Sequence, residues 1–278
     1  MTPKERHIKT ATLIEILILA VIQGVTEWLP ISSTGHLQMA EVYFGLKLAP
    51  FFDVLLHVAS LLVVLVVFRN PIARILKAVF RLDFKSEDGK MALFVIAGSI
   101  PTGIIGFVFQ DWIKSVFFGN PSAIGIAFLS WGTFMFVGFI FIRRYKRETA
   151  KELNFLDSFL VGLAQGIALI PGVSRSGMTI TTALLRKVDG KKAFTFSFLL
   201  FIPAVIGATV ATVAEAQNLF AELNYADVIL AFVVTFAVGF VVLKLLSTIL
   251  MREKFHLFAY YCWAIGIVVL LTQALGLL

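Results

Sequence analysis

Residues 23–36 read QGVTEWLPISSTGH, and this polar stretch interrupts the apolar segment 11–46 near its middle. The apolar segment 156–188 is interrupted in the same way by PGVSRSG at 171–177. Pro, Gly, Ser and Thr break or cap helices. At membrane depth, irregular backbone survives only where protein or a water-filled cavity satisfies its polar groups. Both segments are therefore predicted to be re-entrant hairpins of two half-helices.

Further apolar segments of about 20 residues are long enough to cross a hydrocarbon core as helices. These six segments lie at about 52–69, 91–110, 121–142, 193–214, 226–247 and 257–278. The chain of 278 residues is 59% hydrophobic and only 15% charged, which is more apolar than a soluble domain. The predicted fold is an all-α polytopic membrane protein with six transmembrane helices and two re-entrant helical hairpins.

The two interruptions repeat each other at a constant offset. Gln23-Gly24 recurs 142 residues later as Gln165-Gly166, and the run 32–35 recurs as 174–177. Each copy holds one hairpin and three spans, so the odd number of spans makes the second copy enter the membrane from the opposite face. The prediction is a single membrane domain, 1–278, made of two inverted repeats at about 11–142 and 153–278. In such folds, paired broken helices meet near the midplane and form the binding site.

The net charge of +7 arises from basic residues that lie between the apolar segments. They form no basic stripe with interleaved aromatic residues, so nucleic-acid binding is not expected. In the inverted-repeat arrangement, 18 Lys and Arg lie on one side, five on the other, and Arg175 inside a hairpin. The basic side is cytoplasmic, so both termini and the active site are expected to face outward from the cytoplasmic membrane. The basic residues on the outward side are Lys4, Arg6, Lys9, Lys47 and Lys114.

Polar side chains at membrane depth are costly and are therefore functional candidates. Glu27 lies just before Pro30, where the first half-helix should end, and Ser32 or Ser33 is a suitable N-cap for the next one. The free N–H groups of a helix N-terminus favour an anion. Ser33 and His36 are three residues apart and share a helix face. With Glu27, they supply the parts of a nucleophile, its base, and an orienting or metal-binding acid.

Arg175 is the only Lys or Arg at the core of either hairpin. A guanidinium is well shaped to grip phosphate bidentately, so its presence indicates an anionic ligand. The competing interpretation is a buried ion pair with Glu27 that fixes the two hairpins together. A similar choice, between phosphate contact and close helix packing, applies to Ser32, Thr34, Ser174 and Ser176.

Two other polar residues are expected to be structural. His57, on a membrane helix beside Asp53, is expected to be a packed, hydrogen-bonded histidine. Asp157 is expected to be the N-cap of the second hairpin. For Gln23, a hydrogen bond to exposed backbone at the break is an equal alternative to a function in the site.

The two motifs resemble those of the bacitracin-resistance type of undecaprenyl-diphosphatase. The first family motif begins with an acidic or Gln residue, which is followed by three residues and a Glu. The sequence Leu-Pro-x-Ser-Ser-Thr-Gly-His then follows, and residues 23–36 match this motif here. The second, Pro-Gly-x-Ser-Arg-Ser-Gly, is matched by 171–177. The similarity extends over nearly the whole chain. It implies hydrolysis of undecaprenyl diphosphate to undecaprenyl phosphate and inorganic phosphate, which recycles the lipid carrier for envelope polysaccharides and confers bacitracin resistance.

The resemblance also implies roles for residues of the site. Ser33 is the implied nucleophile, with His36, Glu27 and Arg175 around it. A divalent cation, Mg²⁺ or Ca²⁺, is the implied cofactor, with Glu27 as its candidate ligand. Since Gln23 stands where some members carry Glu, a direct metal-binding or acid–base role is in doubt at this position. The expected supporting residues are Gln23, Gly35 and Gly177.

In the predicted reaction, the lipid tail enters between helices and the diphosphate lies where the hairpins meet. Ser33 attacks in line, with His36 as general base or as acid for the leaving lipid phosphate. A variant in which Glu27 or His36 activates water directly fits equally well. The rival function is a polyprenyl-phosphate transporter or flippase, since inverted repeats with broken helices are typical of transporters. The expected partners are the polyprenyl diphosphate and membrane lipids, with a homodimer left open.

Overall fold

The computed structural model describes residues 11–46, 48, 50–145, 150–215, 224–250 and 256–277. Within these ranges the regular secondary structure is helical, apart from one isolated bridge between Lys151 and Val188. Some of the basic residues used for the predicted orientation lie outside the described residues: Lys4, Arg6, Lys9, Lys47, Lys146, Arg147, Arg252 and Lys254.

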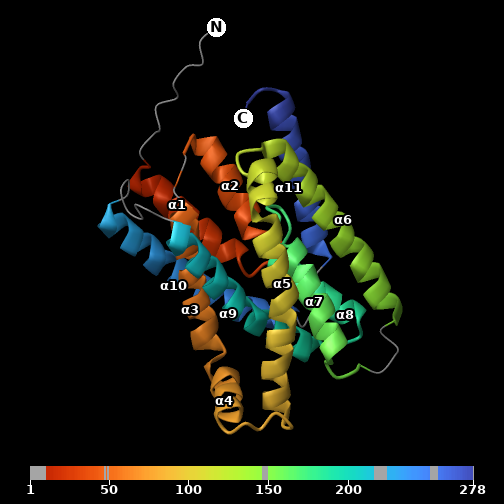
Figure 1. Cartoon of the computed structure of the whole chain (residues 1–278). Helices are drawn as coiled ribbons and strands as arrows, with labels where there is room; N and C mark the ends of the chain where they lie inside the picture. Colours follow the sequence, from red (N-terminus) through yellow and green to blue (C-terminus); the bar gives the residue numbers. More distant parts are fainter. Residues whose placement is uncertain are drawn as a thin grey trace.

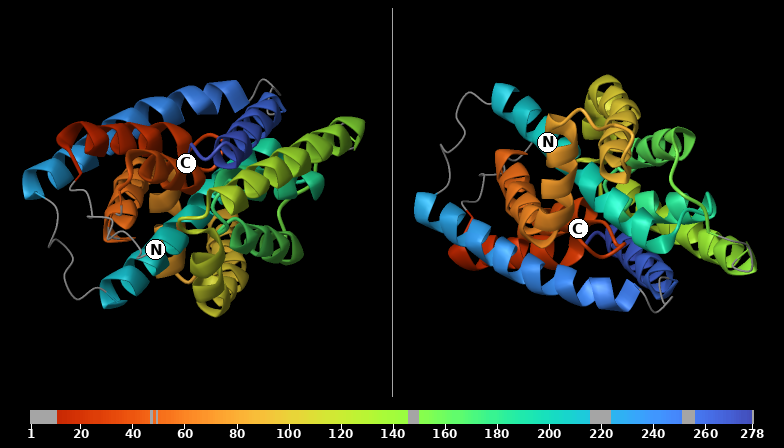
Figure 2. Two further views of the ribbon diagram at one scale, coloured as in Figure 1. Left: turned by 90° about the horizontal axis from the view of Figure 1, so that it is seen from above. Right: turned by 90° about the horizontal axis from the view of Figure 1, so that it is seen from below.

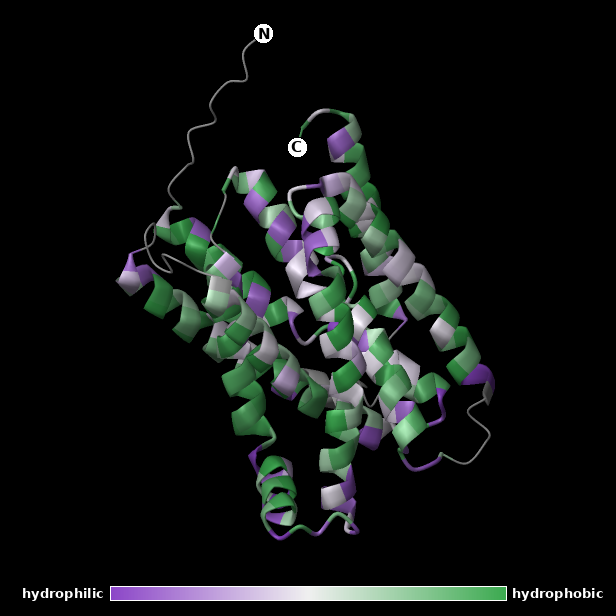
Figure 3. Ribbon diagram, viewed as in Figure 1, coloured by the Kyte–Doolittle hydropathy of each residue, from purple (hydrophilic) through white to green (hydrophobic). Residues whose placement is uncertain are grey.

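Six helices are long and apolar enough to cross a membrane, which confirms the predicted all-α membrane fold (Figure 1). Apolar residues cover much of their outer surface (Figure 3). For example, Phe107 is 81% exposed, as expected for a side chain that faces lipid. These helices are α3 (Pro50–Val67), α5 (Glu87–Phe117), α6 (Pro121–Tyr145), α9 (Gly190–Glu215), α10 (Tyr225–Leu250) and α11 (Leu257–Ala274).

Each interrupted segment forms a pair of short helices joined by a polar turn. The first pair is α1 (Leu13–Thr26) and α2 (Ser33–Phe44), and the second is α7 (Phe155–Ile167) and α8 (Arg175–Leu185). The two members of each pair pack against each other. Their lengths of 11 to 14 residues fall short of the ~20 that a spanning helix needs. They match the predicted half-helices, while their re-entrant placement in a bilayer stays a prediction.

The helix α4 (Arg69–Phe80) was not anticipated from the sequence. It joins α3 to α5 and carries basic residues such as Arg74 and Lys77 beside exposed apolar ones such as Leu76 and Phe80. This mixture is too polar and too short for a membrane span, so a search for apolar segments passes over it.

Both helix pairs begin with the same capping arrangement. The Thr12 hydroxyl accepts a hydrogen bond from the backbone N–H of Glu15 at 3.4 Å. The Asn154 side chain, 142 residues later, accepts one from the backbone N–H of Asp157 at 2.9 Å. The offset seen between the interruptions therefore extends to the beginnings of α1 and α7.

The prediction that Asp157 caps the second pair is wrong, because Asn154 is the N-cap of α7. The Asp157 side chain is fully buried and accepts ion pairs from Lys151 at 2.7 Å and Arg186 at 2.9 Å. A buried carboxylate needs such partners, and these two cations fix the beginning of α7 to the end of α8.

The helices of the two halves pack against each other in matching pairs. Helix α10 lies along α1, and α5 lies along α7 (Figure 2). In each contact, a threonine of the longer helix donates to a backbone carbonyl of the shorter one, from Thr235 to Ala20 at 3.1 Å and from Thr102 to Gly162 at 2.8 Å. Likewise, α3 packs on α9 and α6 on α11. This exchange of partners brings the two polar turns together.

Candidate active site

The turn between α1 and α2 contacts the turn between α7 and α8. The Ser32 hydroxyl accepts hydrogen bonds from the backbone N–H groups of Gly172 at 3.0 Å and Gly35 at 3.3 Å. The Ser174 hydroxyl donates to the backbone carbonyl of Leu29 at 3.4 Å. Each N-cap serine therefore bonds to the opposite turn, and the N-termini of α2 and α8 lie close together, as an anion site requires.

Glycines permit this close approach. A Cβ atom on Gly35 would lie 2.8 Å from the backbone nitrogen of Gly172 and 2.7 Å from the Phe128 ring. Gly177 packs in the same way against Trp131 and Pro30. The structure thus gives the predicted supporting residues Gly35 and Gly177 a packing function at the contact between the turns.

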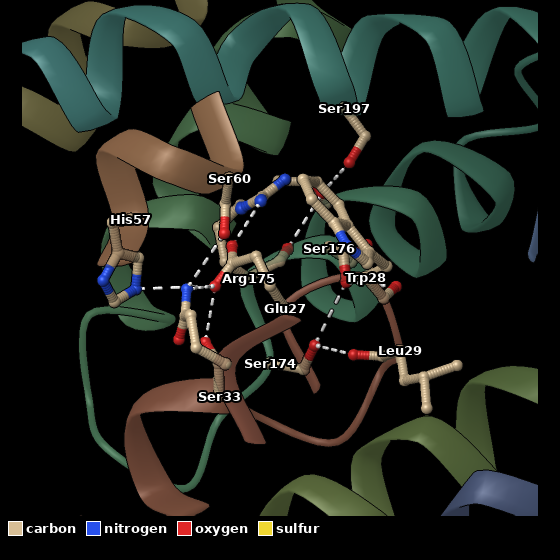
Figure 4. Close-up of polar contacts among 12 residues, drawn as sticks. Glu27, Trp28, Leu29, Ser33, His57, Ser60, Ser174, Arg175, Ser176 and Ser197 are labelled. Carbon is tan, nitrogen blue, oxygen red and sulfur yellow. Dashed lines mark hydrogen bonds and ion pairs between the residues drawn. The ribbon is translucent and has the colours of Figure 1, made fainter. Parts of the chain in front are cut away.

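The Glu27 carboxylate is the centre of a buried polar cluster (Figure 4). Its Oε1 atom lies 2.7 Å from Nη2 of Arg175. Its Oε2 atom accepts hydrogen bonds from the Ser33 hydroxyl at 2.6 Å and from the Gln23 amide at 3.0 Å. The ring nitrogen Nε2 of His57 lies 3.4 Å from the same oxygen. Both oxygens of this carboxylate are therefore engaged.

The Arg175 guanidinium has one engaged and one unpaired amino group. Nη2 binds Glu27, whereas Nη1 is buried and has no acceptor among the described residues. The guanidinium carbon lies 3.9 Å from the centroid of the Phe201 ring and 5.8 Å from that of Phe198, so cation–π contact holds the group in place. The ion pair considered from the sequence is present, and the unpaired Nη1 leaves a donor for a ligand oxygen.

The His36 ring is not hydrogen-bonded to Ser33, although the two residues lie three positions apart on α2. Nδ1 of His36 lies 2.7 Å from the Ser32 carbonyl oxygen, and Nε2 lies 2.8 Å from the Tyr261 hydroxyl. The ring also stacks on Tyr261, with 5.7 Å between the centroids. Glu27, rather than His36, accepts the Ser33 hydrogen bond.

The other predicted hydroxyl residues differ in their contacts. Ser176 donates to the backbone carbonyl of Trp28 and shares a hydrogen bond with Ser174, both at 3.3 Å. These bonds link the beginning of α8 to the first turn. Thr34 is half-buried, and its hydroxyl has no hydrogen bond in the part of the chain that the structure describes.

Sequence reasoning missed the contributions of α3 and α11. The His57 ring was expected to be packed and hydrogen-bonded, and its Nδ1 does lie 2.8 Å from the backbone carbonyl oxygen of Asp53. Its contact with Glu27 was not expected. The Ser60 hydroxyl accepts a hydrogen bond from Gln23 at 3.3 Å. A signal was present, because Asp53, His57 and Ser60 form a polar stripe at helical spacing on the apolar α3. Tyr261 had no comparable signal, since an exposed aromatic residue on a membrane helix is ordinary.

The cation implied by the family resemblance does not fit Glu27. Both oxygens of this carboxylate already accept donors, and the Arg175 guanidinium balances its charge. In the described ranges, no group of three or more His, Cys, Asp or Glu side chains is arranged to hold a metal ion. A cation at Glu27 would therefore lie close to the positively charged guanidinium of Arg175, which is unfavourable.

Known proteins match this chain over nearly its whole length. Residues 16–268 match the family described as bacitracin resistance protein BacA. An undecaprenyl-diphosphatase of Carboxydothermus hydrogenoformans is 37% identical, with 94% of this chain and 98% of that protein covered. One of Halothermothrix orenii is 34% identical, with 94% and 98% covered, and undecaprenyl-diphosphatase 1 of Shouchella clausii is 36% identical, with 95% and 98% covered. The chain therefore belongs to the family of the bacitracin resistance protein BacA.

Proposed function

We propose that this membrane protein is an undecaprenyl-diphosphatase. It hydrolyses undecaprenyl diphosphate to undecaprenyl phosphate and inorganic phosphate, and so recycles the lipid carrier for cell-wall synthesis and confers bacitracin resistance. The observation that carries the proposal is the hydrogen-bonded series from Ser33 through Glu27 to Arg175, with distances of 2.6 and 2.7 Å. It joins a nucleophile, a proton acceptor and a phosphate-binding cation, as phosphoryl transfer requires.

In the proposed reaction, the terminal phosphate of the lipid enters where the N-termini of α2 and α8 meet. The unpaired Nη1 of Arg175 and the free N–H groups of the two helices stabilise its charge, which is the main catalytic effect in phosphoryl transfer. The Ser33 proton passes to Glu27 Oε2 as Ser33 Oγ attacks the terminal phosphorus. The bond to the bridging oxygen breaks, and undecaprenyl phosphate leaves.

Water then hydrolyses the phosphoserine and releases inorganic phosphate, with Glu27 positioned to move the protons. In the alternative reaction, Glu27 activates water directly and no phosphoserine forms. His36 is assigned a positioning function in either reaction, because its ring nitrogens face Ser32 and Tyr261 rather than the Ser33 hydroxyl.

The site is proposed to face outward, with the basic ends of the helices in the cytoplasm. The proposal draws support from the basic residues of α4, the end of α6 and the end of α8, because these elements lie toward the same end of the molecule (Figure 1). The matching helix contacts of the two halves support the inverted repeat, in which the two helix pairs enter from opposite faces.

The transporter alternative is not favoured, because the relatives are named undecaprenyl-diphosphatase and a transporter needs no nucleophile.

The test is phosphate release from undecaprenyl diphosphate by the detergent-purified chain, with and without a chelator. The Ser99→Ala variant is the control for Ser33→Ala, since the one hydrogen bond of the Ser99 hydroxyl within the described residues goes to the carbonyl of Val95 in its own helix. Wild type and control should release phosphate, and Ser33→Ala should not. A purified, folded wild type that releases none would overturn the proposal.

A further inference from the structure

Tyr261 lies beside the active site and has no function in the reaction above. It belongs to α11, and its side chain is 41% exposed. Its hydroxyl oxygen lies 2.8 Å from Nε2 of His36, and the planes of the two rings are only 15° apart. On another side, the His36 ring meets the Phe128 ring of α6 at a nearly perpendicular angle, with 5.1 Å between the centroids. The last helix of the chain therefore supplies the polar partner of a histidine on α2.

The contacts of the two ring nitrogens show which of them carries hydrogen. Nδ1 of His36 lies 2.7 Å from the backbone carbonyl oxygen of Ser32. Because a carbonyl oxygen can only accept, Nδ1 carries the ring hydrogen, and Nε2 of the neutral ring is an acceptor. The Tyr261 hydroxyl therefore donates to Nε2, and this is the one hydrogen bond of Nε2 within the described residues. A donor at Nε2 favours the tautomer with hydrogen on Nδ1.

This tautomer acts on the backbone next to the nucleophile. The Ser32 carbonyl belongs to the peptide group that joins Ser32 to Ser33. It accepts two hydrogen bonds from His36, one from Nδ1 of the ring and one from the backbone N–H at 3.3 Å. Ser32 has a positive φ, a conformation that persists only where surrounding contacts enforce it. The His36 ring therefore helps to hold the peptide group from which Ser33 reaches Glu27.

We propose that Tyr261 is a positioning residue for the nucleophile Ser33. Its hydroxyl holds His36 in the tautomer with hydrogen on Nδ1, and His36 in turn holds the Ser32 carbonyl. A hydrogen-bond partner that fixes the tautomer and orientation of a histidine is a common feature of active sites. The effect of Tyr261 on turnover rests on the proposed function, whereas its effect on the His36 ring does not.

The first test compares two neighbouring tyrosines of α11. Tyr261→Phe removes the hydroxyl and keeps the ring that lies against His36. Tyr260→Phe is the matched control, because the Tyr260 side chain is similarly exposed, at 50%, and its hydroxyl forms no hydrogen bond in the part of the chain that the structure describes. Rates are compared at equal amounts of folded protein, with undecaprenyl diphosphate as substrate.

The kcat of Tyr261→Phe should fall about tenfold, because one hydrogen bond is lost. Its KM should not change, since the hydroxyl acts on the nucleophile rather than on substrate binding. Tyr260→Phe should keep the wild-type kcat. An unchanged kcat of Tyr261→Phe, or a change confined to KM, would overturn the proposal.

A double variant tests whether Tyr261 acts through His36. The side-chain amide in His36→Asn can still donate to the Ser32 carbonyl, but it is too short to reach Tyr261. If the two residues act as one unit, Tyr261→Phe should cause no further loss of kcat in the His36→Asn protein. Losses that multiply in the double variant would show that Tyr261 acts independently of His36 and would also overturn the proposal.

Nitrogen NMR tests the same contact without substrate. The chain has four histidines, and in detergent-purified protein labelled with ¹⁵N-histidine the signals missing from His36→Asn belong to His36. At a pH at which the ring is neutral, Nδ1 of His36 should be the protonated nitrogen in wild type and in Tyr260→Phe. In Tyr261→Phe, both signals should move toward the values of two exchanging tautomers.

His36 signals that are identical in wild type and Tyr261→Phe would contradict the proposal. A wild type that releases no phosphate would instead contradict the proposed function, and the nitrogen signals would still decide whether Tyr261 holds the His36 ring.

Discussion

The adjacent hydroxyl groups of Ser32 and Ser33 have different environments. Ser33 donates to Glu27 at 2.6 Å, whereas Ser32 accepts from the backbone N–H groups of Gly35 and Gly172. Ser32 also has a positive φ of 69°, a conformation that costs a non-glycine residue about 1–3 kcal/mol and persists only where the surroundings enforce it. Ser32 thus maintains the contact between the turns, and Ser33 is placed for chemistry.

This difference predicts separate effects of two alanine substitutions. Ser33→Ala should abolish phosphate release and leave the melting temperature nearly unchanged. Ser32→Ala should keep turnover per folded molecule, but it leaves the buried N–H of Gly172 unsatisfied, which costs about 1–3 kcal/mol of stability. Turnover and melting temperature are measured on the same purified variants. The reverse pattern would move the nucleophile to Ser32.

Arg175 allows a test of phosphate binding against structural pairing. Arg175→Lys keeps a positive charge for Glu27 but loses the second amino group, so turnover should fall about ten- to a hundredfold with little change in stability. Arg175→Ala leaves Glu27 as an unpaired buried charge, which should also cost ~3–5 kcal/mol of stability. Rates are compared at equal amounts of folded protein. Normal turnover of the Lys variant would leave Arg175 with a structural function only.

The sequence predicted which residues of the two motifs meet, but not every contact between them. Glu27, Ser33 and Arg175 were foreseen because broken helices of paired repeats converge. The His36 partner was not foreseen, since Tyr261 lies 225 residues away and local periodicity carries no information about such a contact. The contact between His57 and Glu27 was not foreseen, because a polar stripe on an apolar helix does not reveal which helix it faces.

At the scale of helices, the contact between α5 and α7 depends on glycine. A Cβ atom on Gly162 would overlap the backbone carbonyl of Gly98. Because the overlapping atoms belong to the backbone, a change of side-chain rotamer cannot relieve the overlap. The Thr102 hydroxyl donates to the Gly162 carbonyl at 2.8 Å, so the two backbones are held close together. This contact fixes α7, and with it the turn that leads to Arg175 at the beginning of α8.

Two glycine substitutions should therefore differ. Gly162→Ala should force the helices apart and lower stability by about 1–3 kcal/mol, as overpacking does. Gly103→Ala, on α5, is the matched control, because nothing lies within 4 Å of its added Cβ atom and Ala is the better helix former. Its melting temperature should equal or exceed that of wild type. Equal losses in both variants would show that the close contact is not what stabilises this helix pair.

The sequence predicted the long helices better than the short one. Apolar length alone identifies the six candidate spans. It does not identify α4, and it places the α5 span at 91–110, whereas the helix continues to Phe117. The extra residues at both ends of α5 include Glu87, Asp88 and Lys114, which an apolar search excludes although a helix accepts them readily near its ends.

At the scale of the whole molecule, the constant offset of 142 residues is matched by packing. Ala20 and Gly162, which are related by this offset, accept hydrogen bonds from threonines of α10 and α5, respectively. The sequence contained the repeat, but it did not indicate that each short helix would pack along a long helix of the other half. Such pairing depends on the shapes of both surfaces, which one sequence segment does not encode alone.

The orientation in the membrane is tested by two cysteine substitutions at opposite ends of α5. Lys85 precedes this helix and is exposed, and Phe118, which follows it, is 41% exposed. Neither side chain forms a hydrogen bond in the described part of the chain, so Lys85→Cys and Phe118→Cys should fold normally. The natural Cys262 is fully buried, and its Cys262→Ser variant gives the background.

If α5 crosses the membrane with its basic end in the cytoplasm, an impermeant thiol reagent added to intact cells should label Phe118→Cys and not Lys85→Cys. Permeabilised cells provide the control, because both cysteines should then react. Labelling of Lys85→Cys alone in intact cells would reverse the orientation and place the site on the cytoplasmic side. Equal labelling of both in intact cells would show that α5 does not span the bilayer. That result would contradict the inverted repeat, because the second helix pair enters from the opposite face only after an odd number of spans.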